Sequence, residues 1–182
     1  MNIIVGVTGS ISAYKALDIV SGFRKEGHNV KVIMTEFSKM FVTEMSLAVI
    51  SANPVITKFG SEGLHVVEHV DLANWADIMV IAPATANTIS KMASIQLDNP
   101  LLCTYSVFAG KKKESWNKIY IAPAMNTHML NMVNPLMTKL VCSNPRIKII
   151  QSDKGMLACG EEGDGKLRNV SDIIQTVCRS GL

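Results

Sequence analysis

The sequence predicts an α/β fold with three layers, in which helices cover both faces of a parallel sheet. Two observations lead to this prediction. Short apolar runs rich in β-branched residues, such as NIIVGV at 2–7 and IMVIAPA at 78–84, alternate with stretches of helical spacing. The runs are apolar at almost every position, which is typical of strands that are buried on both faces. A doubly wound sheet of the flavodoxin-like or Rossmann-like class accommodates this pattern.

The elements follow one another regularly along the chain. We expect strands at 2–7, 29–35, 78–84, 118–124 and 146–151. We expect helices at 11–27, 38–51, 72–77, 85–94, 101–110, 134–143 and 170–181. In the first helix Ala16, Ile19, Val20 and Phe23 share one face, and Gly27 ends it. An Asn-Pro pair is expected to begin the helix at 134.

Length and composition exclude several classes of protein. The 182 residues suit one domain, 1–182, and a content of 48% hydrophobic and 18% charged residues predicts a globular chain. The net charge is +3, and the basic run at 111–113 has no interleaved aromatic residues, so we expect no nucleic-acid partner. No signal peptide and no apolar run of spanning length are visible, so we expect no membrane association. The four cysteines lack zinc-type spacing, which predicts reduced thiols, a cytoplasmic protein and no metal site.

Polar, small-residue segments follow the predicted strands. Ligands of parallel sheets bind at the carboxyl ends of the strands, where these segments would form one rim. The segments are TGSIS, TEFS, APATANT, APAMNTHM and, later in the chain, ACGEEGDGK.

The first segment, VTGSISAYK, matches neither the dinucleotide fingerprint nor the P-loop. Its glycine turn and hydroxyl groups at a helix N-terminus favour one phosphate group. An ordinary turn between a strand and a helix is the alternative.

The Ala-Pro-Ala exits of APATANT and APAMNTHM suit a planar heterocycle. Proline directs the chain sharply away from the strand, small residues allow close approach, and the asparagine amides offer both donors and acceptors. Two similar turns without a ligand remain the alternative. Near them in the chain, His69 stands close to Glu68 and Asp71 and is either a general base or a helix-capping or surface residue.

The stretch LACGEEGDGK predicts a flexible, polar loop that exposes Cys159. The glycines in this stretch and just before it would act as hinges of a lid that delivers the thiol to a substrate as a proton donor or nucleophile: Gly155, Gly160, Gly163 and Gly165. A small thiol buried in a turn is the alternative.

Taken together, these motifs resemble those of the homo-oligomeric, flavin-containing cysteine decarboxylases. The resemblance covers nearly the whole chain. The family's Pro-x-Met-Asn-x-x-Met motif falls on Pro123, Met125, Asn126 and Met129, and its Ala-Cys-Gly-x-x-Gly-x-Gly clamp falls on 158–165. The resemblance implies FMN, bound between protomers of a homotrimer or a multiple of trimers. The implied cofactor-binding residues are Gly9, Ser10, Ile11, Thr35, Ser38, Ala84, Thr85, Ala86, Asn87 and Thr88.

The resemblance also implies roles in a reaction. His69 matches the active-site histidine, Asn126 matches the residue that binds the substrate carboxylate, and Cys159 matches the cysteine that protonates the intermediate. The implied substrate-binding residues are Asn126, Met129, Ala158, Gly160 and Lys166. The implied activity is the FMN-dependent oxidative decarboxylation of 4'-phosphopantothenoylcysteine to 4'-phosphopantetheine in coenzyme A biosynthesis. Oxidation of the thiol-bearing carbon lets the sulfur carry the charge that CO2 leaves behind, and a later reduction restores the redox balance.

Some residues depart from the family pattern, and other functions stay open. Ser94 and Ile95 stand where Asn-Gly is frequent, Leu130 where an aromatic residue is frequent, and Lys166 where an arginine is common. The alternatives are the peptidyl-cysteine decarboxylases of lantibiotic precursors, the flavin prenyltransferases, non-catalytic phosphatase-regulating relatives and a plain nucleotide-binding module. The ACGEEGDGK loop favours the small-molecule decarboxylases over the peptidyl-cysteine ones, and the Pro-x-Met-Asn motif with the cysteine clamp argues against the prenyltransferases. The presence of His69, Asn126 and Cys159 together argues against a non-catalytic relative, and a nucleotide-binding module is the alternative if no flavin is bound.

Overall fold

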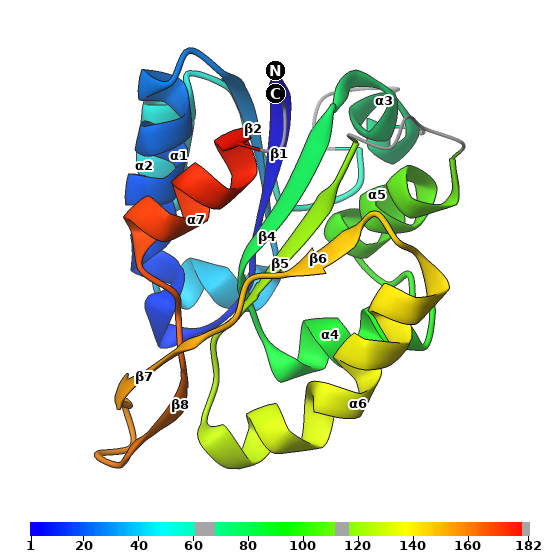
Figure 1. Cartoon of the computed structure of the whole chain (residues 1–182). Helices are drawn as coiled ribbons and strands as arrows, with labels where there is room; N and C mark the ends of the chain where they lie inside the picture. The colour runs from blue at the N-terminus through cyan, green and yellow to red at the C-terminus, as the bar shows by residue number, and fades with distance from the viewer. Residues whose placement is uncertain (61–67, 112–116, 180–182) are drawn as a thin grey trace.

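The computed structural model describes residues 1–60, 68–111 and 117–179, and its centre is a six-stranded parallel sheet of order β3-β2-β1-β4-β5-β6 (Figure 1). The strands are β1 Asn2–Val7, β2 Asn29–Met34, β3 Val55–Ile56, β4 Ile78–Ala84, β5 Ile119–Pro123 and β6 Ile147–Ile149. The predicted parallel sheet is therefore confirmed. The sequence analysis missed β3, because two residues are too few to show a strand pattern.

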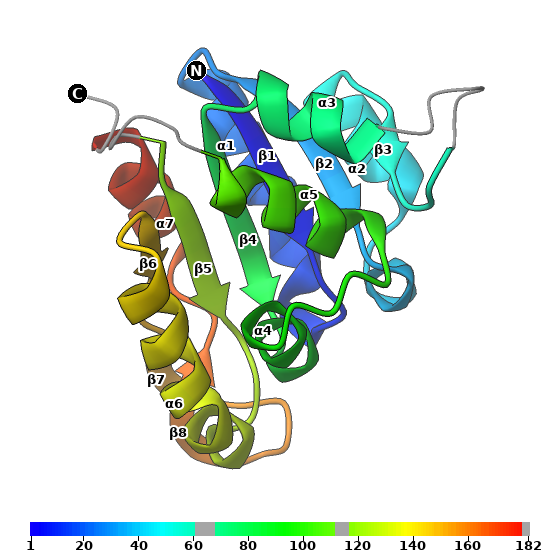
Figure 2. The same ribbon diagram turned by 90° about the vertical axis from the view of Figure 1, so that its right-hand side faces the viewer.

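Helices cover both faces of the sheet, as Figures 1 and 2 show. One face carries α1 Ala16–Lys25, α2 Glu44–Ser51 and α7 Val170–Cys178. The other carries α3 Glu68–Trp75, α4 Ala86–Ala93, α5 Pro100–Gly110 and α6 Thr127–Ser143. The predicted three-layer, doubly wound α/β fold is confirmed.

Two hydrophobic cores separate these layers. Ile3 and Val5 of β1 point into the first core, beside Phe23 of α1, whereas Ile4 points into the second, beside Phe108 of α5. This alternation follows from the period of two in a strand. Each of these side chains is inaccessible to solvent, and burying one contributes about 1.5–3 kcal/mol.

Four predicted helices differ from the observed ones, and one of them is the helix predicted at 72–77, which begins at Glu68 and ends at Trp75. The first begins as a 3-10 helix, η1 Ile11–Lys15, before α1, and the second is divided into η2 Glu36–Met40 and α2. The helix predicted from 134 begins instead at Thr127, so that Pro135 lies inside α6. Asn126 caps this helix by accepting a hydrogen bond from the His128 amide, and Pro135 is exposed, so its turn can be hydrated.

The second half of the glycine-rich stretch belongs to a hairpin, so the prediction of a loop is wrong for residues 162–166, whereas the predicted exposure of Cys159 is confirmed. The antiparallel strands β7 Asp153–Met156 and β8 Glu162–Lys166 pair with each other and stand apart from the main sheet, at the lower end of the molecule in Figures 1 and 2. Gly155 and Gly163 face each other in the pairing, and Cys159 lies in the turn. A pattern of glycines and acids conceals such strands because it has no apolar alternation.

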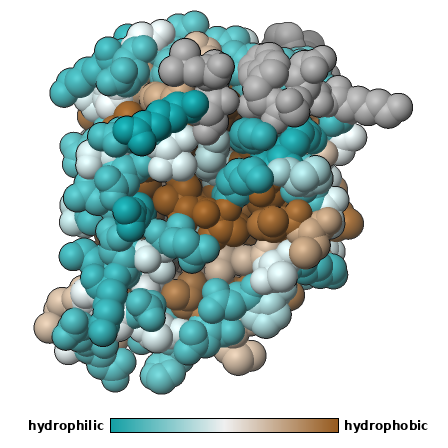
Figure 3. Space-filling model, viewed as in Figure 1, coloured by the Kyte–Doolittle hydropathy of each residue, from teal (hydrophilic) through white to brown (hydrophobic). Residues whose placement is uncertain are grey.

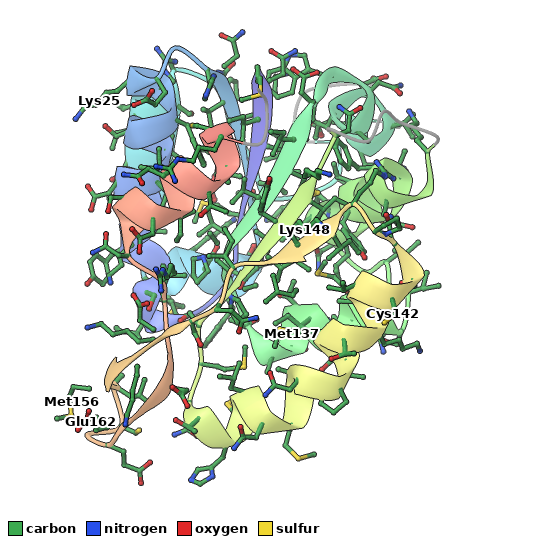
Figure 4. All side chains as sticks on the ribbon, viewed as in Figure 1. Lys25, Met137, Cys142, Lys148, Met156 and Glu162 are labelled. Atoms are coloured by element: carbon green, nitrogen blue, oxygen red, sulfur yellow. The ribbon has the colours of Figure 1, made fainter. Side chains whose placement is uncertain are left out.

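The open edge of the sheet carries an apolar groove. Figure 3 shows apolar side chains gathered at the centre of the face that includes β6 and α6. The groove there is lined by Met137, Val141, Ile147 and Ile149 together with polar side chains such as Lys148, and Figure 4 shows Met137 and Lys148 on this side of the molecule.

Some expectations concern residues outside the described ranges, namely Lys112 and Lys113 of the basic run and residues 180–181 of the last helix. Within the described ranges, no helix has the length and apolar character needed to cross a bilayer. No cluster of three metal-ligating side chains occurs in the same part of the chain.

Candidate functional site

The ends of the central strands are tied together by hydrogen bonds. Thr8, which follows β1, is buried, and its Oγ1 donates to the carbonyl oxygen of Pro83 at 2.7 Å and accepts from the amide of Thr85 at 3.0 Å. The amide of Ala124, which follows β5, donates to the carbonyl oxygen of Ala84 at 3.0 Å. These contacts hold three of the predicted polar segments at one edge of the sheet.

A cleft of about 620 Å³ opens at this edge. Seven predicted cofactor residues line it, together with Met129 from the predicted substrate set: Gly9, Ser10, Thr35, Thr85, Ala86, Asn87 and Thr88. Its volume lies within the range of small-molecule sites, roughly 300–1,000 Å³. The predicted polar rim therefore encloses a cavity of ligand size.

The other three predicted cofactor residues do not line this cleft. Ser38 is buried, and its hydroxyl group donates to the carbonyl oxygen of Thr35 at 2.6 Å, so it braces the loop. Ala84 is buried at the end of β4, and Ile11 lies in a second hollow.

Two helices begin at the cleft. Thr85 caps α4, and its Oγ1 accepts from the Thr88 amide at 3.4 Å. Asn99 caps α5 by accepting from the amide of Leu102 at 3.1 Å, with Pro100 in the first turn. The free amides and dipoles of such helix starts favour an anionic group.

An ion pair closes one side of the cleft. The Lys91 ammonium group on α4 contacts the Asp98 carboxylate, and both residues line the cavity. The Lys91 ammonium, through its hydrogen bond, lowers the pKa of the Asp98 carboxyl group. The sequence analysis assigned neither residue, because a pair seven positions apart across a loop has no helical spacing.

A second hollow of about 530 Å³ lies between η1 and the hairpin. It adjoins the cleft, because Ser10, Ala124 and Met125 line both. The residues that line only the second hollow include five predicted from the sequence: Ile11, Asn126, Ala158, Cys159 and Lys166. Lys15 and Tyr14 also line it, although the sequence analysis assigned them no role.

Asn126 and Cys159 meet in this hollow. The Asn126 side-chain amide donates to the Cys159 Sγ at 3.4 Å, although 33 residues separate the two in the chain. The thiol in turn donates to the carboxylate of Glu161 at 3.8 Å. Both partners are exposed enough for a substrate to reach them, so an amide donor and a thiol can act on the same group.

The glycines of the hairpin allow it to dock against the start of α6. The Met125 amide donates to the carbonyl oxygen of Gly165 at 3.0 Å, and the Thr127 hydroxyl donates to that of Asp164 at 2.6 Å. A Cβ atom on Gly163 or Gly165 would lie 2.3 Å from the Thr127 Oγ1 or 2.2 Å from the Met125 carbonyl oxygen. These two glycines therefore permit close packing, and the prediction that they are hinges is not supported.

His69 lies elsewhere. It is in the first turn of α3, not before it as the sequence suggested, and its ring packs edge-to-face on Phe59 with centroids 6.2 Å apart. It lines neither the cleft nor the second hollow. Figures 1 and 2 both place α3 at the opposite end of the molecule from the hairpin, so one chain does not bring His69 to Cys159.

The residues that depart from the family pattern have clear places. Leu130 is buried in the second core, and Ile95 is 73% exposed with a φ of 55°, a conformation that favours glycine. Lys166 lies at the base of the hairpin.

Comparisons with known proteins agree with the fold and the motifs. Residues 1–181 match the model of the flavoprotein family. The coenzyme A biosynthesis bifunctional protein CoaBC of Borreliella burgdorferi is 37% identical over 178 residues, covering 97% of this chain and 43% of that protein. The CoaBC of Bacillus subtilis is 35% identical over 175 residues, covering 96% of this chain and 41% of that protein. The chain thus spans less than half of the length of these relatives.

Other relatives are matched over nearly the whole length of both chains. A probable phosphopantothenoylcysteine decarboxylase of Streptococcus mutans is 35% identical over 178 residues, which cover 96% of each chain. A cysteine-to-serine mutant of PPC decarboxylase, solved with pantothenoylaminoethenethiol, superimposes with a TM-score of 0.85 at 29% identity, covering 98% of this chain and 96% of that one. The FMN binding protein AtHal3 superimposes with a TM-score of 0.76 at 31% identity, covering 98% and 95%. The chain belongs to the flavoprotein family, as the resemblance of its motifs predicted.

Proposed function

We propose that the protein is an FMN-dependent decarboxylase that converts 4'-phosphopantothenoylcysteine to 4'-phosphopantetheine in coenzyme A biosynthesis. The observation that carries this proposal is the contact between Asn126 and Cys159 beside a cleft of ligand size. Similarity over 96% of both chains to a probable phosphopantothenoylcysteine decarboxylase supports it. Residues 1–182 would act as one domain, in the cytoplasm.

The cleft fits a flavin mononucleotide. The helix starts at Thr85 and Asn99 and the hydroxyl groups of Ser10 and Thr88 suit a phosphate and a ribityl chain. Phe37 and Met125 supply apolar surface for a planar ring. When bound, the flavin supplies a reversible acceptor for a hydride, which the side chains of the protein lack.

The chain's own residues would bind the substrate and move its protons. The Asn126 amide donates to the substrate carboxylate and orients it for loss as CO2, once the adjacent thiol-bearing carbon has been oxidised. The electron pair left by CO2 is then held by the sulfur of the substrate. Cys159 donates its Sγ proton to carbon in the final reduction, and its thiolate regains a proton from solvent. The reaction leaves no net change in oxidation state.

The site also needs a second copy of the chain, and we propose a homotrimer or a multiple of trimers. His69 is remote from the cleft of its own chain, so a neighbouring protomer would supply it. Exposed apolar side chains border the cleft on η2 and the first turns of α6, and a protomer contact would cover them: Phe37, Met40, Met129 and Met132.

The test is to load the purified protein with FMN, record its visible spectrum, and measure CO2 release from 4'-phosphopantothenoylcysteine and from a peptide that ends in cysteine. We expect a yellow protein that acts on the first compound. Cys159→Ser should release CO2 but accumulate the oxidised, decarboxylated intermediate. Cys142→Ser is the matched control, because Cys142 is exposed on α6 and lines neither the cleft nor the hollow. A protein that takes up no FMN, or full turnover by Cys159→Ser, would refute the proposal.

A further inference from the structure

Two lysines line the second hollow together with the reactive pair. Lys15 ends η1 and Lys166 ends β8, so they come from opposite sides of the hollow. Asn126 and Cys159 belong to the same hollow. A molecule that fills it would therefore meet two positive charges as well as the amide and the thiol.

Neither ammonium group is neutralised by the protein. Within the described part of the chain, Lys15 and Lys166 have no carboxylate within 4.0 Å, whereas Lys39 contacts Glu36 at 3.0 Å. Asp153 faces Lys166 across the hairpin, but its carboxylate forms a salt bridge with the Arg168 guanidinium at 2.9 Å. Both lysines are thus available to an external anion.

The geometry separates the lysine of the hairpin from its thiol. A methyl group added at Gly155 would lie 3.5 Å from the Lys166 Nζ, so the ammonium group lies over the paired strands and not over the turn that holds Cys159. The Lys166 side chain thus reaches from the end of β8 to the level of the Gly155–Gly163 pair. An extended 4'-phosphopantothenoylcysteine, whose cysteine and phosphate ends are separated by on the order of 10–14 Å, is long enough to reach from the turn to this level.

We propose that Lys15 and Lys166 bind the 4'-phosphate group of the substrate while Asn126 and Cys159 act on its cysteine end. This inference rests on the proposed function and names the residues that select a phosphorylated substrate. Two flexible ammonium groups suit a phosphate, which accepts point charges from several directions. A peptide that ends in cysteine has no such group for them to bind.

The experiment compares 4'-phosphopantothenoylcysteine with pantothenoylcysteine, which lacks the phosphate, on the FMN-loaded protein. We expect Lys15→Gln and Lys166→Gln each to reduce the preference in kcat/KM for the phosphorylated compound by about 10- to 100-fold, the range for one hydrogen bond to a charged group. The change should fall mainly on KM, because the phosphate is remote from the reacting carbon. Lys154→Gln is the matched control, because this exposed lysine of β7 does not line the hollow, and it should keep the preference of the unaltered protein.

Calorimetry provides a readout without turnover. Titrating 4'-phosphopantetheine and pantetheine should show that the lysine variants lose the difference in Kd between these two compounds. Equal losses for both compounds, or an unchanged preference, would overturn the phosphate assignment. Absence of CO2 release from either substrate with the unaltered protein would instead count against the proposed function, and the titration would still decide whether the lysines recognise a phosphate.

Discussion

Asn126 combines a structural role with the substrate-binding role that we propose for it. Its Oδ1 caps α6 by accepting from the His128 amide at 2.8 Å, which leaves its Nδ2 free to donate to Cys159. The cap fixes the side chain, so the amide is oriented before a substrate binds. Ile95, in contrast, has a backbone conformation that does not suit its side chain. The left-handed region favours glycine, which is frequent at this position in the family.

Tyr105 on α5 is expected to make the folded protein less stable as the pH rises into the alkaline range. Burial raises the pKa of Tyr105 to about 12, because the folded protein disfavours the phenolate. The folded pKa is higher than the unfolded one, so the contribution is complete below about pH 10 and is lost as the pH rises towards 12. We expect the free energy of unfolding to fall by about 2–3 kcal/mol over this range from this residue. Urea titrations between about pH 9 and pH 12 measure it, and Tyr105→Phe should remove this part of the loss; an identical pH dependence in both proteins would contradict it.

At the scale of elements, the hairpin is held by main-chain contacts with the segment before α6. Gly165 has a φ of 117°, and its carbonyl oxygen accepts from the Met125 amide, so the strand can approach only because it has no side chain there. This contact places the turn with Cys159 over Asn126. Figure 4 shows the side chains of Met156 and Glu162, which face each other across the hairpin, projecting from its outer end.

Gly165→Ala should detach the hairpin. The added methyl group would lie 2.2 Å from the Met125 carbonyl oxygen, and the backbone is in a region that alanine rarely adopts, a combined cost of about 1–3 kcal/mol. We expect faster amide hydrogen exchange across 153–166 and slower turnover, with the sheet unaffected. Gly110→Ala is the control, because nothing lies within 4 Å of its added methyl group, and it should leave the exchange of the hairpin unchanged. Equal exchange in both variants would show that Gly165 does not hold the hairpin.

At the scale of the whole molecule, the parallel sheet brings distant segments to one edge. Thr8 reaches Pro83 and Thr85 across 75 and 77 residues, and these contacts build the cleft. The sheet also places α3, with His69, away from the hairpin. We therefore expect a neighbouring copy of the chain to complete the proposed site.

Mixed oligomers test this arrangement. His69→Asn and Cys159→Ser should each be unable to complete the reaction, while both still bind FMN. When the two variants are denatured together and reassembled, about a quarter of the sites should regain both residues, because each site draws them from different protomers. Product formation measures the recovery, and variants assembled separately and then mixed are the control. No recovery on reassembly would place both residues in the same chain.

The fold and the position of the cleft follow from local sequence patterns. Apolar β-branched runs such as 78–84 are typical of strands buried on both faces, and carboxyl ends of parallel strands meet at one edge, so the cleft at Gly9, Thr35 and Thr85 was predictable. The resemblance of the motifs pointed to Asn126 and Cys159. In the structure the Asn126 Nδ2 lies 3.4 Å from the Cys159 Sγ.

Only the tertiary structure decided the rest. Whether Ser38 faces a ligand or the Thr35 carbonyl oxygen, whether Gly165 is a hinge or a contact, and whether His69 reaches the cleft all depend on residues far away in the chain. Local propensity carries no information about such contacts, because their free energy exists only when both partners are already in place. The sequence by itself determined the layers and the rim, whereas packing between distant segments decided which side chains share a cavity.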